Sequence, residues 1–169
     1  MHQPGAMHWL PLCALCFVGC GAAGDVDSGP PAPVEEERIE TSAVLGHGLT
    51  GFMPLSDGDE LLVEQGYQGG FHLSVNARVA GFLGTAPTIV FHGELMSSGE
   101  EACHGVYENV RLVDDGDGWL RFPAGARCYV GDPTMVIMQG VRLFVEVSAG
   151  ERVAKDSREI RAGRLIKPY

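Results

Sequence analysis

The sequence has no long hydrophobic run and none of the common enzyme signatures. Its most apolar stretch, residues 9–20, holds about ten apolar residues, well short of the roughly 20 that a membrane-spanning helix needs. It has no G-x-S-x-G nucleophile elbow, no P-loop, no dinucleotide fingerprint and no S-x-x-K pair. We therefore expect a protein that is not an enzyme and that needs no cofactor.

Basic residues are scarce: 12 Lys and Arg stand against 22 Asp and Glu, and the formal net charge is −10. This balance argues against nucleic acid or an anionic bilayer surface as the main partner, because both repel an acidic protein. Half of the basic residues recur at every third position near the C-terminus, namely Arg152, Lys155, Arg158, Arg161, Arg164 and Lys167. We expect them on a solvated last strand; the alternative is a basic tail for phosphates, acidic glycans or an acidic partner.

Residues 9–20 are typical of a bacterial lipoprotein signal. Val18 and Gly19 are small enough for a peptidase cleft just before Cys20, and the small residues at 21–24 follow it. The pattern predicts a signal peptide over 1–19 and a diacylglycerol on the thiol of Cys20, which becomes the first mature residue. The alternative is an ordinary secretory signal that is cut elsewhere.

The remaining cysteines agree with export. Cys13 and Cys16 leave with the signal and Cys20 carries lipid, so only Cys103 and Cys128 are left. Two thiols in an oxidising compartment are expected to form one disulfide. A metal site that uses these two cysteines lacks the C-x-x-C spacing of convincing zinc sites.

A segment rich in proline, glycine and glutamate follows over residues 20–42. It has almost nothing to bury and cannot offset its own chain entropy, so we expect a disordered linker. Such a linker would hold the folded domain roughly 25 Å from the lipid. The remaining residues, 43–169, are enough for one domain with its own core.

Alternating apolar residues predict half-buried strands in 71–79, 88–95 and 141–147. Turn-forming clusters separate these from shorter candidates at 61–63, 106–113, 119–122 and 153–160. The expected fold is therefore all-β, an antiparallel β-sandwich of about seven to eight strands. Residues 123–140 are expected to form a long, partly irregular connection held by Cys128.

Three stretches, 51–61, 68–73 and 140–147, carry a resemblance to a known group. They resemble the pattern "F-x-P-L-x-D-G", "Q-G-G-x-H" and "V-x-L-x-V-x-V" of predicted lipoproteins from myxobacteria and related Gram-negative bacteria. The resemblance implies a lipid-anchored protein with one immunoglobulin-like domain and brings no established activity. The chain departs from the pattern at 145–152, so the resemblance implies nothing about the conformation of the last hairpin.

The most distinctive short motif is Gln68-Gly69-Gly70-Phe71-His72. Two glycines at the start of a strand allow positive φ or a very close backbone approach. As a binding site, the motif would use Gln68, Gly69, Gly70 and His72 as ligand contacts. As a purely structural motif, it would be a bulge with Phe71 in the core and His72 on the solvent face, and this interpretation is favoured.

Two weaker site hypotheses concern metal ions. His72 and His92 both fall on the predicted solvent faces of strands that could pair, and with Glu94 they could bind Zn²⁺ or Cu²⁺. The acidic run at 114–118 resembles a calcium loop, but Trp119 occupies a position that requires an oxygen ligand. A hairpin turn explains the same acidic run through Asp-Gly turn chemistry.

These observations predict a lipid-anchored, non-catalytic binding or structural module of the cell envelope. Gly21 after Cys20 agrees with sorting to the outer membrane, with the domain on the periplasmic or the cell-surface side. The membrane is the expected partner through Cys20, and an envelope protein or glycan is the possible ligand. The alternatives are a metal-binding protein or enzyme that uses the outward-facing histidines, and a carbohydrate binder with Tyr67, Trp119 or Phe144 exposed.

Overall fold

A computed structural model describes residues 39–48 and 51–167 of the chain. The chain divides into two units, Met1–Glu36 and Glu37–Tyr169, and the structure described below is that of the second unit. The predicted signal peptide, Cys20 and most of the predicted linker lie outside the described residues.

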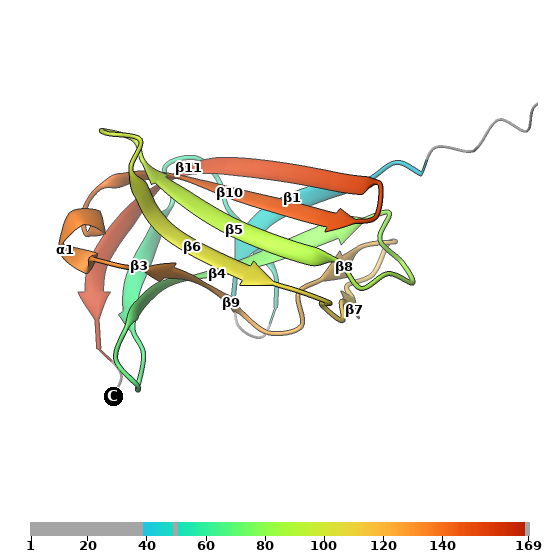
Figure 1. Ribbon diagram of the computed structural model, residues 1–169, viewed down its shortest axis with the longest axis horizontal. Coiled ribbons are helices and arrows are strands. Elements are labelled where there is room, and N and C mark those ends of the chain that lie inside the picture. The colour runs from blue at the N-terminus through green and yellow to red at the C-terminus, as the bar shows by residue number, and fades with distance from the viewer. Residues whose placement is uncertain (1–38, 49–50, 168–169) are drawn as a thin grey trace, which may run out of the picture. The chain divides into compact units, whose positions relative to one another are not determined.

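The described residues form eleven strands and one short helix, so the predicted all-β class is confirmed (Figure 1). The elements are β1 (Ser42–His47), β2 (Met53–Pro54), β3 (Glu60–Gln65), β4 (Phe71–Ala80), β5 (Thr88–Leu95), β6 (Glu101–Tyr107), β7 (Val113–Asp114), β8 (Leu120–Arg121), β9 (Ala126–Val130), α1 (Pro133–Val136), β10 (Gly140–Ala149) and β11 (Arg152–Ile166).

Three expectations about the elements were wrong. The strand count exceeds seven to eight because β2, β7 and β8 have only two residues each, too few for any alternation to show. The strand expected at 106–113 ends at Tyr107, and most of it precedes that range. Residues 123–140 contain β9 and α1, whose first turn is capped by the Asp132 carboxylate accepting from the Thr134 amide at 2.9 Å.

Seven strands join in a closed ring in the order β4-β3-β11-β10-β5-β6-β9, because β9 pairs back onto β4. One pairing in the ring, β3 with β11, is parallel, and the sheet is therefore not purely antiparallel as expected. Strand β4 is long enough to serve two sets of neighbours. Its first half pairs with β3 and β9, and its second half pairs with β1 and β8.

One row of directly paired residues runs around the whole ring. It leaves β11 at Ser157 and rejoins the same strand at Ile166, which is the stagger that a closed sheet requires. Between these two ends the row passes through Phe144, His92, His104, Tyr129, His72 and Glu64. The ring closure therefore places aromatic and imidazole side chains of five different strands side by side.

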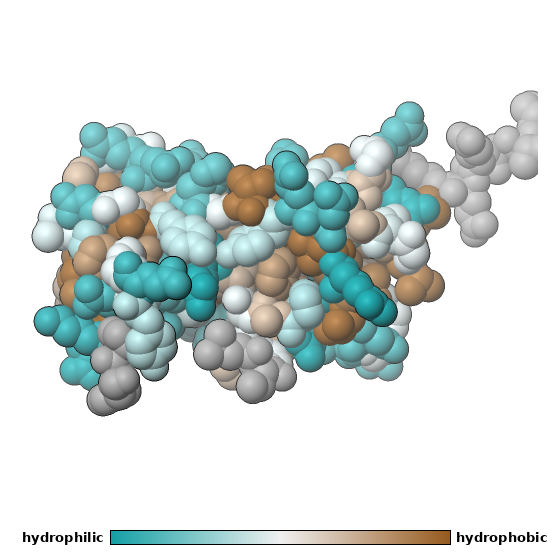
Figure 2. All heavy atoms as spheres, turned by 60° about the horizontal axis from the view of Figure 1, so that its bottom comes forward, coloured by the Kyte–Doolittle hydropathy of each residue, from teal (hydrophilic) through white to brown (hydrophobic). Residues whose placement is uncertain are grey.

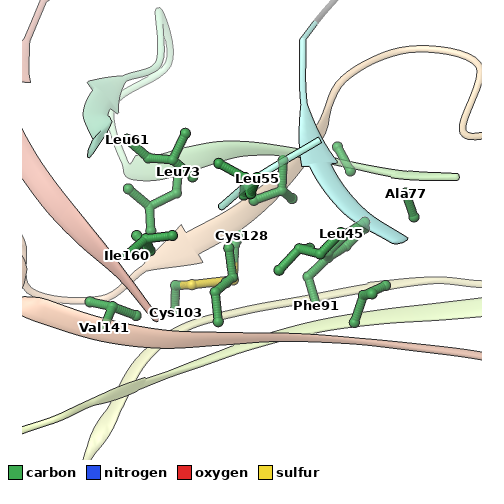
Figure 3. Close-up of a cluster of buried hydrophobic side chains, with 14 of the residues drawn as sticks. Leu45, Leu55, Leu61, Leu73, Ala77, Phe91, Cys103, Cys128, Val141 and Ile160 are labelled. Atoms are coloured by element: carbon green, nitrogen blue, oxygen red, sulfur yellow. A yellow bond between two sulfur atoms is a disulfide. The ribbon is translucent and has the colours of Figure 1, made fainter. Parts of the chain in front are cut away.

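The inward-facing residues form one hydrophobic core. Figure 3 shows part of it, with Leu45, Leu73 and Ala77 on one side and Phe91 and Val141 on the other. The alternation predicted for β4, β5 and β10 is confirmed, because the predicted inward residues from Leu73 onward are buried in all three strands.

The other face of β4 is not the solvent face that the sequence predicted. Asn76 is fully buried: its amide nitrogen donates to the Gly48 carbonyl at 3.0 Å, and its amide oxygen accepts from the Ala77 amide at 2.8 Å. His72 is only 7% exposed. Asn76 is bonded to the backbone that follows β1, and His72 lies between the side chains of its paired neighbours Glu64 and Tyr129, contacts that the alternation along one strand cannot reveal.

A polar contact closes the gap between β1 and β11, which face each other without backbone pairing. The Asp156 carboxylate accepts a hydrogen bond from the Leu45 amide at 2.8 Å and pairs with Arg158 at 2.5 Å. Arg158 in turn donates from Nε to the Leu55 carbonyl at 2.9 Å. These two side chains satisfy backbone groups that would otherwise be left without partners at the seam.

Candidate functional site

The hairpin between β3 and β4 contains the Q-G-G motif. Its loop, residues 66–70, is held by hydrogen bonds from the Gly66 amide to the Gly70 carbonyl (3.1 Å) and from the Gly69 amide to the Gly66 carbonyl (3.0 Å). Gly69 and Gly70 have φ values of +83° and +74°, a region that favours glycine. A Cβ on either would meet nothing within 4 Å, so these glycines serve the backbone conformation and not a close approach.

A cleft with a volume of about 560 Å³ lies against this hairpin. All four residues of the binding-site hypothesis, Gln68, Gly69, Gly70 and His72, line it. The other polar and aromatic side chains of the cleft are Glu64, Gln65, Tyr67, Arg127, Tyr129 and Lys167. Of these, the sequence pointed to Tyr67 and Lys167, each in a separate hypothesis, and did not connect them with the Q-G-G motif. Tyr67 belongs to the hairpin loop, and the others come from β3, β9 and the residue after β11; closure of the sheet brings β9 to this group.

His72 lies in the wall of the cleft between two charged groups. Its Nε2 is 3.6 Å from a Glu64 carboxylate oxygen, and its ring lies 6.4 Å from the ring of Tyr129. Desolvation by burial lowers the pKa of His72 below its ordinary value of 6.5, the Glu64 charge opposes this shift, and the Arg127 charge adds to it. His72 is therefore a neutral hydrogen-bonding group at neutral pH.

The disulfide predicted between Cys103 and Cys128 is present, with a Cα–Cα distance of 5.2 Å (Figure 3). It joins β6 to β9 on the inner side of the sheet. Arg127 and Tyr129 flank Cys128 in sequence and point the opposite way, toward the cleft. A Cβ on Gly93 would lie 2.8 Å from the Cys103 sulfur, so this glycine leaves room for the cross-link.

The histidines of the metal hypothesis do not come together. His72 belongs to β4 and His92 to β5, and these strands are separated by β9 and β6 in the ring. His92 instead lies 3.8 Å from Glu94 and 3.7 Å from Glu101, and its ring is 6.2 Å from that of His104. Within residues 39–48 and 51–167, no group of three His, Cys, Asp or Glu side chains is placed to hold a metal ion.

The acidic run at 114–118 forms the predicted hairpin turn between β7 and β8. The Asp115 carboxylate is 2.9 Å from Nε of Arg78 and 3.1 Å from Nε of Arg121, and Arg78 also lies over the Trp119 ring. Two guanidinium groups therefore neutralise the central carboxylate of the calcium hypothesis. Trp119, a candidate for sugar stacking, is engaged on one face by Arg78.

The basic residues near the C-terminus do not form one patch. Along β11 they alternate between the two faces of the sheet, and three of them have separate partners. Lys155 pairs with Glu146, Arg158 with Asp156, and Arg152 donates to the Gly81 carbonyl. Of this set, only Lys167 lines the cleft.

A second, smaller hollow of about 370 Å³ lies on the outer face of β5, β6 and β10, around His92, His104 and Phe144. The His92 and Phe144 rings are stacked, 6.0 Å apart and inclined by 19°. The molecular face in Figure 2 shows hydrophobic residues scattered among hydrophilic ones. In the part of the chain that the structure describes, no helix is long and apolar enough to cross a bilayer.

Comparison with known proteins adds little. No protein-family model matches the chain, and no curated protein matches it. Among solved structures, the CooA pilin subunit from enterotoxigenic Escherichia coli is similar over 72% of this chain and 98% of that chain, with 7% sequence identity and a TM-score of 0.37. A similarity at this level supports no conclusion about function, so the assignment depends on the cleft itself.

Proposed function

We propose that this chain is a lipid-anchored protein of the cell envelope whose β domain is a non-catalytic binding module with its ligand site in the cleft at the β3–β4 hairpin. The observation that carries the proposal is the convergence of Gln68, Gly69, Gly70 and His72 on one cleft. The sequence singled out these four residues as a motif, and the fold adds side chains from β3, β9 and the end of β11 around them.

The chemistry of the cleft favours binding. Its lining offers two amides, a neutral imidazole, two phenol rings, a carboxylate and two cations, which are groups that orient a polar ligand. Among the described residues that line it there is no serine, threonine or cysteine, the side chains with a hydroxyl or thiol nucleophile that an adjacent base activates. An envelope protein or a glycan is the class of ligand that an exported domain meets.

The anchor and the address rest on residues 9–21, outside the described part of the chain. We propose that Cys20 is lipidated and that the protein sits in the outer membrane, on its periplasmic or surface face. We also propose that the domain is a variant of the immunoglobulin-like sandwich of the myxobacterial-type lipoproteins that it resembles. The support is the layer of β5, β6, β10 and β11 that lies over β1, β3 and β4, with the core between the two layers.

The test is capture of envelope components by the purified, full-length chain in detergent. The wild type is compared with Tyr129→Ala and Gln68→Ala, which change the cleft, and with Leu83→Ala. Leu83 is 81% exposed and follows the far end of β4, so it controls for loss of an exposed apolar side chain elsewhere. We expect a component that the wild type and Leu83→Ala retain and both cleft variants lose. Retention by all four proteins, or by none, would show the proposal to be wrong.

A further inference from the structure

The cleft carries positive charge on an otherwise acidic protein. Arg127 and Lys167 both line it, whereas the whole chain has a net charge of −10. Neither side chain takes part in an ion pair within residues 39–48 and 51–167, although Lys155, Arg158 and other basic side chains do. Among the described residues that line the cleft, Glu64 is the one carboxylate; it lies 3.6 Å from His72, and the two cations outnumber it. Two exposed cations are thus available to an anionic group, and Arg127 presents the planar fork that suits a carboxylate or a phosphate.

Exposed aromatic rings lie beside these cations. Tyr129 is 54% exposed and is two residues from Arg127 on β9, and Tyr67 is 87% exposed in the hairpin loop. A protein normally covers rings of this size, and a phenol ring is well suited to pack against the apolar C–H face of a sugar. Gln68 and neutral His72 supply donors and acceptors of the kind that hydroxyl groups require.

The aromatic surface continues away from the cleft. In the row around the ring, Tyr129 is followed by His104, His92 and Phe144, one residue from each successive strand. At about 4.8 Å per strand, this part of the row is roughly 15 Å long. The row is acidic at His92, its third residue, because Glu94 and Glu101 lie within 4 Å of that side chain. An extended ligand would therefore place its anionic group at the cleft and its uncharged part along the row.

We infer that the ligand of the cleft is an acidic saccharide, with its carboxylate or phosphate group bound by Arg127 and Lys167 and a sugar ring packed on Tyr129. The inference rests on the proposed function and names the class of ligand for that same site. A carboxylated sugar and a phosphorylated sugar present the same chemistry to the two cations, and the experiment below distinguishes them.

The experiment is isothermal titration calorimetry of the full-length chain in detergent with three probes. These are trigalacturonate, a deacylated phosphorylated core oligosaccharide of lipopolysaccharide, and neutral galactotriose. We expect at least one acidic probe to bind about tenfold or more tightly than the neutral one, with an affinity that falls as salt is raised from about 50 to about 500 mM. Preference for trigalacturonate identifies the group as a carboxylate, and preference for the core oligosaccharide identifies a phosphate.

Variants assign the effect to the cleft. Arg127→Gln and Lys167→Gln should each weaken binding of the acidic probe about tenfold while leaving binding of the neutral probe unchanged. Arg111→Gln is the matched control. Arg111 is an exposed cation that follows Val110, whose amide donates to the carbonyl of Pro87 just before β5, and this place is remote from the β3–β4 hairpin. Tyr129→Ala should weaken acidic and neutral probes alike. Thermal unfolding of each variant checks that the fold is intact.

Three results would overturn the inference. One is no binding of either acidic probe at about 1 mM. Another is equal binding of acidic and neutral probes with no effect of Arg127→Gln or Lys167→Gln. The third is a poly-glutamate peptide that binds as tightly as the acidic saccharides. In each case the proposed function still stands if Tyr129→Ala and Gln68→Ala abolish capture of the envelope component, so the two failures can be told apart.

Discussion

The phenolic oxygen of Tyr107 makes two hydrogen bonds to the backbone of Arg127, donating one to its carbonyl at 2.9 Å and accepting one from its amide at 2.6 Å. Strands β6 and β9 pair directly only at His104 and Tyr129, and the Tyr107 hydroxyl continues the connection beyond that pair. The Tyr107 ring is fixed by edge contacts with Phe122 and Phe91, 5.0 and 6.1 Å away. Tyr107 thereby fixes the backbone position from which the Arg127 side chain extends toward the cleft.

Replacing Tyr107 with Phe should lower the free energy of unfolding by about 1 kcal/mol, because the Arg127 amide and carbonyl lose their partner while water can reach this edge. Urea unfolding followed by Trp fluorescence measures the change. Tyr67→Phe removes the same hydroxyl from an 87% exposed residue and should leave stability unchanged. Equal stability of wild type and Tyr107→Phe would show that the two bonds contribute nothing net.

His72 should make the domain less stable in acid. Burial lowers its pKa in the folded state below 6.5, so the unfolded chain binds the proton more readily. The stabilising contribution is complete above pH 6.5 and is lost as the pH falls through the folded-state pKa. Urea unfolding at about pH 7.5 and about pH 5 should show a smaller acid-induced loss in His72→Gln than in the wild type. His104→Gln, an exposed histidine of the same row, should retain the wild-type loss.

Asp156 and its neighbour Lys155 allow two ion pairs to be compared: one between β1 and β11, and one on the exposed surface. Asp156→Ala leaves the amide of the fully buried Leu45 without its acceptor and removes the ion-pair partner of Arg158, which keeps the Leu55 carbonyl, and we expect a loss of about 2 kcal/mol. Lys155→Ala breaks a solvent-exposed pair with Glu146 and should cost under about 1 kcal/mol. Chemical denaturation of both variants measures the difference. Similar losses for the two would mean that the seam adds no stability.

The disulfide closes a loop between positions 25 residues apart, and its removal should lower the free energy of unfolding by about 3 kcal/mol. The double variant Cys103→Ala/Cys128→Ala tests this without burying a new polar group. Wild-type protein in dithiothreitol should lose a comparable amount, and the double variant should not respond to the reductant. If dithiothreitol also destabilised the double variant, its effect on the wild type could not be assigned to this disulfide.

Lipidation of Cys20 is open to a direct test in cells. Cys20→Ser should abolish incorporation of labelled palmitate and move the protein from the membrane fraction to the soluble envelope fraction. An inhibitor of the lipoprotein signal peptidase should cause a larger precursor of the wild type to accumulate. Retention of the label in Cys20→Ser would contradict the assignment of the lipidated residue, and Cys16→Ser is the control that should behave as the wild type.

The strands that the sequence predicted well share one property. Strands β4, β5 and β10 each bury alternate side chains in one core, and Leu73, Phe91 and Leu143 show this as a period of two. Strands β2, β7 and β8 are too short to have a period, and β9 alternates over only five residues between segments that contain glycine and proline. The turn at 114–118 was predictable because Asp-Gly pairs favour the φ values that a tight hairpin needs.

Only those cleft residues that are neighbours in the sequence could be located by sequence analysis. Gln68, Gly69, Gly70 and His72 could be singled out because two adjacent glycines before a strand are a local conformational signal. Arg127, Tyr129 and Lys167 carry no such signal, since each is one polar residue on a strand or at its end. The predicted metal set failed for the same reason: alternation says which way His72 and His92 point, and nothing about which strands become neighbours.

The sequence by itself therefore determined the all-β class, the main strands, the pairing of the two remaining cysteines and the glycine hairpin, because each depends on local conformation or on simple exclusion. The tertiary structure alone decided that β9 returns to β4 and closes the ring. That closure, which depends on long-range strand pairing and a shared core, places Tyr129 directly beside the buried His72. It also brought Arg127 and Tyr129 to the hairpin and aligned imidazole and aromatic rings across five strands.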